Sequence, residues 1–303
     1  MEPDGDCIGS QLALASVLKR MGKEAVLCSS GPFKRTEIKN YENHFTASPE
    51  VKPGDRAFIL DCASFDRIGN LEAIFMNLPC AVIDHHESGS ISESSGSLNF
   101  LYLDKKAPST TYLVFQLIEA LGFTPTREEA EFLFFGLCTD TGFFRHADSK
   151  SKHTFNMAAD LIHYGANPKN TFADIHGGKS LDSRKLLAHV LLRAEPHFEG
   201  KLILSWENIE ETEQYGREGR DSDSLYQLLQ SVEGVEAIVI IRQEKPEYCT
   251  VGFRSRDSVD VGIIARHFGG GGHKNAAGLK IDGKIDQIKT EILNEFSKIF
   301  NNR

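Results

Sequence analysis

Two short apolar runs in the first half of the chain each end directly on an aspartate. Phe58, Ile59 and Leu60 are followed by Asp61, and the run over 81–83 is followed by Asp84. These β-rich runs alternate with amphipathic helical patterns, which is typical of a parallel sheet covered by helices. In open α/β sheets ligands bind outside the carboxyl ends of the strands. We therefore expect both acids to lie at a functional edge of an α/β domain.

Periodicity gives further elements in this half. Apolar residues recur with helical spacing over 10–21 and stop before Gly22, which suits the end of a helix. Thr126 and Glu129 have the spacing of a capping box that opens the next helix. The patterns together predict strands at 25–28, 57–60 and 80–83, and helices from about 109 to 121, 127–137 and 152–163.

The second half of the chain becomes richer in β-strand patterns after a charged helix over 182–193, which we expect to be a connector. Strands are predicted at 202–206, 237–241 and 249–254, and helices at 224–231, 259–268 and 285–300. A length of 303 residues suits two domains of roughly 150 residues each. We place them at 1–190 and 191–303, the latter including the connector.

Composition excludes several classes of protein. The net charge of -9 argues against a broad basic surface for long duplex nucleic acid. No apolar run approaches the roughly 18 residues of a membrane span. The six cysteines are scattered without a C-x-x-C pair, so a disulfide scaffold or a zinc ribbon is not expected. These features favour a cytoplasmic protein that does not bind membranes.

Acids and histidines gather at four predicted strand–helix junctions. Carboxylates mixed with imidazole suit Mn²⁺, Mg²⁺ or Fe²⁺ better than a metal that prefers thiolates. Each residue alone also has a structural interpretation, since an Asp before a helix commonly caps it and an Asp after a strand commonly forms a turn. An acid beside a histidine can also orient its ring. The set is Asp4, Asp6, Asp61, Asp84, His85, His86 and Asp140.

Taken in order, these residues resemble the four metal-binding motifs of the DHH phosphoesterase superfamily. The motifs are Asp4-Gly-Asp6, Asp61, Asp84-His85-His86 and Asp140 within Thr-Asp-Thr-Gly. The stretch over 252–255 and the glycine-rich stretch over 268–278 resemble the DHHA1 substrate domain of that family. The size and the paired domains are most similar to the nanoRNase (oligoribonuclease) and pAp phosphatase group.

This resemblance implies a fold and a site. The fold is α/β, with a parallel-sheet DHH domain that has helices on both faces, a smaller α/β DHHA1 domain, and the active site in the cleft between them. The resemblance also implies roles for individual residues. Asp4 and Asp61 would hold a first Mn²⁺, and a second would be held by Asp6, Asp61, His85 and Asp140, with Mg²⁺ or another divalent metal as alternatives. The catalytic residues would be His86, Asp61 and Asp84. The substrate would be bound by Arg254, Ser255, Gly270, Gly271, Gly272 and His273.

One motif departs from the family pattern. The family has a metal-ligating His four residues before the first Asp, and that position falls immediately before Met1. We expect the natural start to lie further upstream, because the other motifs are intact. The alternative is a chain that lacks this ligand.

The leading hypothesis is an Mn²⁺-dependent hydrolase that releases 5′-mononucleotides from very short RNA and converts pAp to AMP. A second hypothesis keeps the chemistry but takes linear or cyclic dinucleotides or single-stranded nucleic acid as substrate. A third is a nucleotide-binding module without catalysis, which the absent His would permit. Expected partners are short oligonucleotides or pAp, and a homodimer is compatible with the sequence, which leaves the oligomeric state open.

Overall fold

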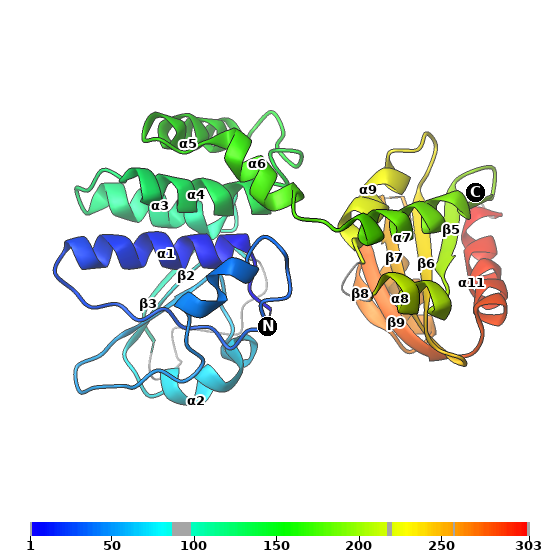
Figure 1. The fold of residues 1–303 in the computed structure, drawn as a ribbon, viewed down its shortest axis with the longest axis horizontal. Coiled ribbons are helices and arrows are strands. Elements are labelled where there is room, and N and C mark those ends of the chain that lie inside the picture. Colours follow the sequence, from blue (N-terminus) through cyan, green and yellow to red (C-terminus); the bar gives the residue numbers. More distant parts are fainter. Residues whose placement is uncertain (1, 87–97, 217–219, 257, 302–303) are drawn as a thin grey trace. The chain divides into compact units, whose positions relative to one another are not determined.

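The chain folds into two compact units, residues 1–178 and 179–303 (Figure 1). The computed structural model describes residues 2–86, 98–216, 220–256 and 258–301. The helix expected as a connector is α7 (Leu181–Leu192), and it belongs to the second unit. Our expected domain boundary at 190/191 therefore falls near the end of α7, whereas the compact units separate just before it.

The first unit contains a parallel three-stranded sheet in the order β1-β2-β3. The strands are β1 (Ala57–Leu60), β2 (Cys80–Asp84) and β3 (Leu98–Leu103). The first two match the predicted strands, and β3 is an addition that the sequence patterns missed. Because the strands are parallel, their carboxyl ends share one edge, and Asp61 and Asp84 both lie there.

Helices cover this sheet on both sides, with α1 and α3 on one side and α2 on the other (Figure 1). Side chains at the helix starts explain the boundaries: Asp4 caps α1, Ser109 caps α3, and Thr126 with Glu129 forms the predicted capping box of α4. The helical segments are α1 (Gly5–Arg20), η1 (Lys39–His44), η2 (Phe65–Leu71), α2 (Glu72–Phe75), α3 (Thr110–Ala120), α4 (Arg127–Asp140), α5 (Lys152–His163) and α6 (Pro168–His176).

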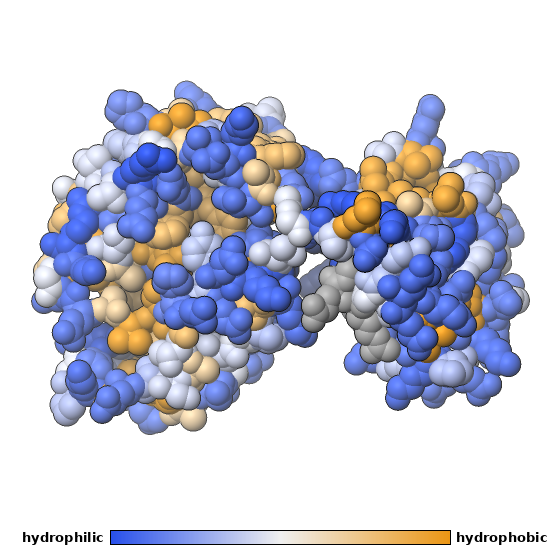
Figure 2. Space-filling view, viewed as in Figure 1, coloured by the Kyte–Doolittle hydropathy of each residue, from blue (hydrophilic) through white to orange (hydrophobic). Residues whose placement is uncertain are grey.

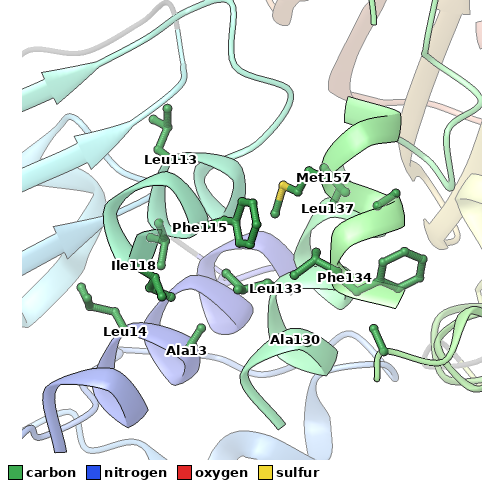
Figure 3. Close-up of a cluster of buried hydrophobic side chains, with 14 of the residues drawn as sticks. Ala13, Leu14, Leu113, Phe115, Ile118, Ala130, Leu133, Phe134, Leu137 and Met157 are labelled. Atoms are coloured by element: carbon green, nitrogen blue, oxygen red, sulfur yellow. The ribbon is translucent and has the colours of Figure 1, made fainter. Parts of the chain in front are cut away.

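The main core of this unit lies between α1, α3, α4 and α5 (Figure 3). Ala13, Leu113, Leu133 and Met157 each come from a different one of these helices and are almost fully buried. Helices α1 and α4 approach each other closely at a glycine, because a Cβ at Gly9 would lie 2.4 Å from the backbone oxygen of Phe132. This close packing sets the distance between the start of α1 and the end of α4.

The predicted strand at 25–28 was wrong. Val26 is exposed, and the segment forms only an isolated bridge between Cys28 and Thr46. Two backbone hydrogen bonds accompany it, from Ser29 to Thr46 and from Thr46 to Leu27. The residues have β propensity, but no strand among the described residues pairs with them over a longer stretch, and strand formation depends on such pairing.

The second unit is built on a six-stranded mixed sheet in the order β4-β5-β6-β7-β9-β8. Its strands are β4 (Glu195–His197), β5 (Leu202–Glu207), β6 (Ala237–Lys245), β7 (Tyr248–Ser255), β8 (Gly271–His273) and β9 (Ala276–Asp282). Besides α7, its helices are α8 (Ile209–Tyr215), α9 (Ser222–Gln230), α10 (Val261–His267) and α11 (Ile285–Phe300). Helices α10 and α11 contribute to the core on one face, which includes Val251 and Phe253 of β7. Helices α7 and α9 pack on the other face, over Ile238 and Ile240 of β6.

On the face shown in Figure 2, hydrophilic residues alternate with hydrophobic areas, and in the second unit the hydrophobic residues gather over α7 and α9. Leu181, Leu192 and Leu228 are among the exposed hydrophobic residues of these two helices. Among the described residues, no helix combines the length and the apolar character needed to cross a membrane.

Candidate metal centre

The candidate site lies at the carboxyl edge of the β1-β2-β3 sheet. Asp61 follows β1 with a backbone φ of +62°, in the left-handed region that is unusual for a residue other than glycine. Asp84 is the last residue of β2, and His85 and His86 follow it directly. Strained backbone of this kind is concentrated at functional sites. The conformation at Asp61 thus agrees with a role beyond forming a turn.

Helix α1 brings Asp4 and Asp6 to the same region. Asp4 is the N-cap, and its Oδ1 accepts hydrogen bonds at 3.1 Å from the backbone N–H groups of Asp6 and Cys7. Asp6 is fully buried in the first turn of the helix. The structural interpretation as a helix cap therefore holds for Asp4, whereas Asp6 points into the protein.

His85 occupies the centre of the cluster. Its Nε2 lies 2.9 Å from Asp140 Oδ2, 3.7 Å from Asp61 Oδ1 and 3.9 Å from Asp6 Oδ2. The contact with Asp140 is an ion pair, although its angles are not those of a regular hydrogen bond. The other ring nitrogen, Nδ1, faces the backbone oxygen of Ala107 at 3.3 Å. Nε2 is therefore a buried nitrogen surrounded by carboxylate oxygens.

Asp84 organises the histidine pair. Its Oδ1 accepts hydrogen bonds from the backbone N–H of His85 at 2.7 Å and of His86 at 3.1 Å, and lies 2.7 Å from Nδ1 of His86. Burial of Asp84 opposes ionisation, but the hydrogen bonds from His86 outweigh it and lower the pKa of the carboxyl group. An ionised Asp84 would keep a proton on Nδ1 of His86 and orient its ring.

The other carboxyl groups experience strong mutual repulsion. Burial and the charge of Asp140 raise the pKa of Asp6 to about 7. Burial and the neighbouring acids, first Asp6, raise the pKa of Asp61 well above its ordinary value. Burial favours the neutral form of His85, but Asp140 and Asp6 outweigh this and raise its pKa to about 9. The negative charge of these carboxyl groups is not fully balanced within the described part of the protein. A bound cation would balance it.

Two overlapping groups of side chains have donor atoms close enough to share a metal ion. One is Asp61, Asp84, His85 and His86, and the other is Asp6, His85 and Asp140, with the donor atoms of each group within 4.8 Å of one another. Oδ2 of Asp84 is a buried atom without a hydrogen-bond partner among the described residues. Oxygen and imidazole donors suit Mn²⁺, Mg²⁺ or Fe²⁺. The residues present therefore fit a centre for divalent metal ions, although Asp4 belongs to neither group.

Sequence reasoning missed the threonines that hold these acids in place. The backbone N–H of Thr110 and that of Thr111 donate to Asp6 at 2.6 and 2.9 Å, and the Thr111 hydroxyl donates at 2.7 Å. The Thr110 hydroxyl donates to Asp61 at 3.0 Å. The hydroxyl residues over 109–111 at a helix start were a visible signal, but only the tertiary structure shows which acids they contact.

A cavity of about 630 Å³ adjoins this centre within the first unit. Asp4, Cys7, Asp61 and His86 line one end of it, and the outer edge of β1 contributes Phe58, which is 44% exposed. The candidate centre is therefore open to a sizeable space on the side of α1 and β1.

The expected substrate-binding residues lie together in the second unit. Arg254 is on β7, with its guanidinium 4.6 Å from the ring centre of Tyr226. His273 is exposed on β8, in the same cross-strand row as Arg254. Ser255 is buried, and its hydroxyl donates to the backbone oxygens of Val259 at 2.7 Å and Lys274 at 3.2 Å. Ser255 thus holds the loops beside Arg254.

The three glycines of this set do not form a loose hinge. A Cβ at Gly270 would lie 2.4 Å from the Cβ of Leu279, so its backbone packs tightly. Gly271 and Gly272 belong to β8 and pair with Gly278 and Ala277 of β9. Gly271 and Gly272 therefore belong to an edge strand of the second sheet, and Gly270 directly precedes it.

Family models match both parts of the chain. The model of the DHH family N-terminal domain covers residues 1–137, and that of the DHHA1 domain covers residues 202–302. The chain is also 32% identical over 296 residues to the bifunctional oligoribonuclease and PAP phosphatase NrnA of Thermus thermophilus, a match that covers 97% of this chain and 86% of that protein. The chain belongs to the DHH family and carries a DHHA1 domain. This confirms the family resemblance found in the motifs.

Further relatives agree with this assignment. The protein of the same name from Bacillus subtilis is 25% identical, with 93% of this chain and 87% of that protein covered. Among solved structures, an exopolyphosphatase-related protein from Bacteroides fragilis matches with a TM-score of 0.79 at 21% identity, covering 99% of this chain and 91% of that one. The structural match supports the two-domain α/β fold predicted from the sequence.

Proposed function

We propose that this protein is a metal-dependent phosphoesterase that hydrolyses short oligoribonucleotides to 5′-mononucleotides and pAp to AMP. The substrates are those named for the relatives from Thermus thermophilus and Bacillus subtilis. The observation that carries the chemistry is His85 Nε2, which is buried and lies within 3.9 Å of carboxylate oxygens from three other segments. Such a donor set is suited to a cation and poorly suited to an empty site.

The metal centre would use Mn²⁺ and draw on four motifs of the first unit. Asp6, Asp61, His85 and Asp140 supply donors that lie close together, and Asp61 is central because its Oδ1 is near both histidines. Asp4 would join Asp61 at the first metal position, in addition to capping α1. When bound, a pair of divalent cations would activate a water molecule and neutralise the charge of the phosphoryl oxygens.

His86 would contact the scissile phosphate. Its side chain is 36% exposed, and Asp84 holds its Nδ1 at 2.7 Å, so Nε2 is left to face substrate. With a proton on both ring nitrogens, a histidine oriented in this way can donate a hydrogen bond from Nε2 to a phosphoryl oxygen as charge develops in the transition state. Asp84 would then act by orienting the ring and by stabilising its positive charge.

The second unit would supply substrate recognition. Arg254 and His273 offer positive charge and hydrogen-bond donors in one row of the sheet, which suits a terminal phosphate or ribose. Gly270, Gly271 and Gly272 present no Cβ that would keep a phosphate away from the backbone, although the N–H of Gly270 already donates to the backbone oxygen of Ala265 at 2.8 Å. Ser255 would support this surface through its hydrogen bonds to the neighbouring loops.

The test is release of AMP from the dinucleotide pApA by the full chain with Mn²⁺. We expect turnover with Mn²⁺, no turnover in EDTA, and a loss of at least about a hundredfold for His86→Asn, the scale of removing one transition-state donor. His44→Asn, in the exposed part of η1, is the matched control and should keep wild-type activity. Nucleotide binding without any metal-dependent hydrolysis would refute the proposal and favour a binding module.

A series of substrate lengths tests the specificity. We expect the rate to fall from dinucleotides to longer strands, and pAp to be converted to AMP. Preference for long single strands, or for cyclic dinucleotides over pApA, would contradict the proposed substrate class while leaving the metal chemistry intact.

A further inference from the structure

The segment that leads into α3, residues 107–110, contacts three of the candidate metal donors. The backbone oxygen of Ala107 lies 3.3 Å from Nδ1 of His85. Thr110 is the first residue of α3 and is fully buried. Its backbone N–H donates to Oδ2 of Asp6 at 2.6 Å, and its hydroxyl donates to Oδ1 of Asp61 at 3.0 Å. One short segment therefore contacts donors from α1, from the end of β1 and from the end of β2.

The two acids that Thr110 contacts belong to different groups of candidate metal donors. Asp6 is in the group that includes Asp140, whereas Asp61 is in the other group. Thr111 differs from Thr110, because it donates both its backbone N–H and its hydroxyl to Asp6. Thr110 thus links one carboxyl group from each donor group, while both of these bonds of Thr111 go to a single acid.

Helix packing holds Thr110 in place. Leu113 and Val114, in the next turn of α3, are fully buried and belong to the same core as Ala13 and Leu14 of α1. Close-packed interiors of this kind resist deformation. The backbone that carries the Thr110 hydroxyl is therefore a rigid support for the two acids.

Asp61 is the acid that depends most on such support. Its backbone φ of +62° is a strained conformation, which persists only where the surrounding contacts hold it firmly. The backbone N–H of Asp61 donates to the oxygen of Ile83 at 3.0 Å, which fixes the main chain but leaves the side chain free to turn. The Thr110 hydroxyl fixes the side chain. The accepting oxygen, Oδ1, lies 3.7 Å from Nε2 of His85 and 3.6 Å from Nδ1 of His86.

We propose that Thr110 is a positioning residue that sets the spacing of the two candidate metal positions, by holding Asp6 through its N–H and Asp61 through its hydroxyl. Two-metal sites hold their ions about 3.5–4 Å apart. A small displacement of Asp61 would therefore weaken metal binding and catalysis together. This inference rests on the proposed function, and it names a residue outside the metal donors on which that function depends.

Two substitutions separate the hydroxyl of Thr110 from its shape. Thr110→Val keeps the branched shape and removes the hydroxyl, whereas Thr110→Ser keeps the hydroxyl and removes the methyl group. Both variants keep the backbone N–H that donates to Asp6. Calorimetry on the full chain should show Mn²⁺ affinity falling at least about tenfold in Thr110→Val and less than about threefold in Thr110→Ser, since losing a residue that orients a metal ligand typically costs about 10- to 100-fold.

Kinetics and spectroscopy distinguish positioning from a purely structural role. For pApA, kcat should fall at least about tenfold in Thr110→Val while KM stays within about twofold, because a fully buried residue does not contact substrate. Electron paramagnetic resonance of protein loaded with Mn²⁺ should show a spin-coupled pair of ions in the wild type and in Thr110→Ser. In Thr110→Val the signal should come mainly from uncoupled ions.

Thr171→Val is the matched control. Thr171 is also a buried threonine near the start of a helix, α6, and its hydroxyl donates to the backbone oxygen of Asn167 at 3.2 Å. The substitution removes one buried hydroxyl from the same unit, and the bond that it breaks lies within α6 and its cap. Thr171→Val should lose stability in EDTA as Thr110→Val does, but keep the wild-type Mn²⁺ affinity, kcat and resonance signal.

Wild-type Mn²⁺ affinity and kcat in Thr110→Val would overturn the inference. Equal losses in Thr110→Ser and Thr110→Val, or in Thr171→Val, would also overturn it, because the hydroxyl on Asp61 would then not be the cause. The proposed function fails separately. A wild type that binds Mn²⁺ without hydrolysing pApA refutes the function, while the Mn²⁺ affinities and resonance signals of the variants still decide the inference. A wild type that binds no Mn²⁺ overturns both.

Discussion

Replacing Asp6 should reveal that this residue supports the fold as well as the metal centre. Asp6 accepts hydrogen bonds from the Thr110 N–H through Oδ2, and from the Thr111 N–H and hydroxyl through Oδ1. The two backbone donors belong to the first turn of α3, where N–H groups have no partner within the helix. Removal of the acceptor would leave these donors buried and unpaired.

The size of this effect follows from comparing two neutral variants. Asp6→Asn keeps one side-chain oxygen and can retain the two bonds to Thr111, whereas Asp6→Ala loses all three. At about 1–1.5 kcal/mol for each retained bond, Asp6→Ala should be less stable than Asp6→Asn by about 2–3 kcal/mol. Because both variants lack the charge, the repulsion from Asp140 cancels in the comparison.

Thermal unfolding in EDTA is the appropriate assay, since metal binding would otherwise contribute to stability. For a unit of this size the difference corresponds to a Tm lower by about 4–12 °C in Asp6→Ala than in Asp6→Asn. Both variants should also lose Mn²⁺-dependent hydrolysis, so activity alone does not separate the two roles. An Asp6→Ala protein as stable as Asp6→Asn would refute the reasoning about α3.

Two other predictions concern packing and pH. Gly9→Ala should lower the free energy of unfolding by about 1–3 kcal/mol in chemical denaturation, because the new Cβ would meet the backbone oxygen of Phe132 at 2.4 Å. Unchanged stability would contradict the close packing of α1 on α4. Burial disfavours ionised Asp221, but hydrogen bonds from Ser224 and Arg184 outweigh it and lower its pKa. A lowered pKa in the folded state stabilises the protein fully above the unfolded pKa of about 3.9, so the stability lost in Asp221→Asn at pH 7 should shrink as the pH falls below that value toward the lowered folded pKa. A difference that does not shrink as the pH falls below about 3.9 would count against this explanation.

The sequence predicted the metal-binding residues of the candidate centre better than the hydrogen bonds that hold them in place. Asp61 and Asp84 could be placed at one edge because each follows an apolar run, and parallel strands share their carboxyl ends. The hydrogen bonds of Thr110 and Thr111 could not be predicted in the same way. They join residues about a hundred positions apart in sequence, such as Asp6 and Thr110, and depend on how α3 packs against α1.

Strand pairing sets a similar limit. The run at 25–28 has the composition of a strand but pairs with the part of the chain that the structure describes through a single bridge, whereas β3 has a partner in β2. In the second unit, Gly252 and Gly278 are visible as glycines in the sequence, but only the register of β7, β9 and β8 places them in one row. Local patterns predict where a strand can form, but pairing with residues distant in the sequence decides whether it forms and which residues lie side by side.

The most direct test of the whole account is AMP release from pApA by the wild-type chain and by Asp61→Asn, with Mn²⁺ and with EDTA. Asp61 is central to the proposed metal centre, and Asn is nearly identical in shape, so the fold should survive while the shared negative donor is lost. We predict Mn²⁺-dependent release by the wild type, none in EDTA, and a loss of at least about a hundredfold in Asp61→Asn. Hydrolysis in EDTA, or equal rates for Asp61→Asn and the wild type, would contradict the account.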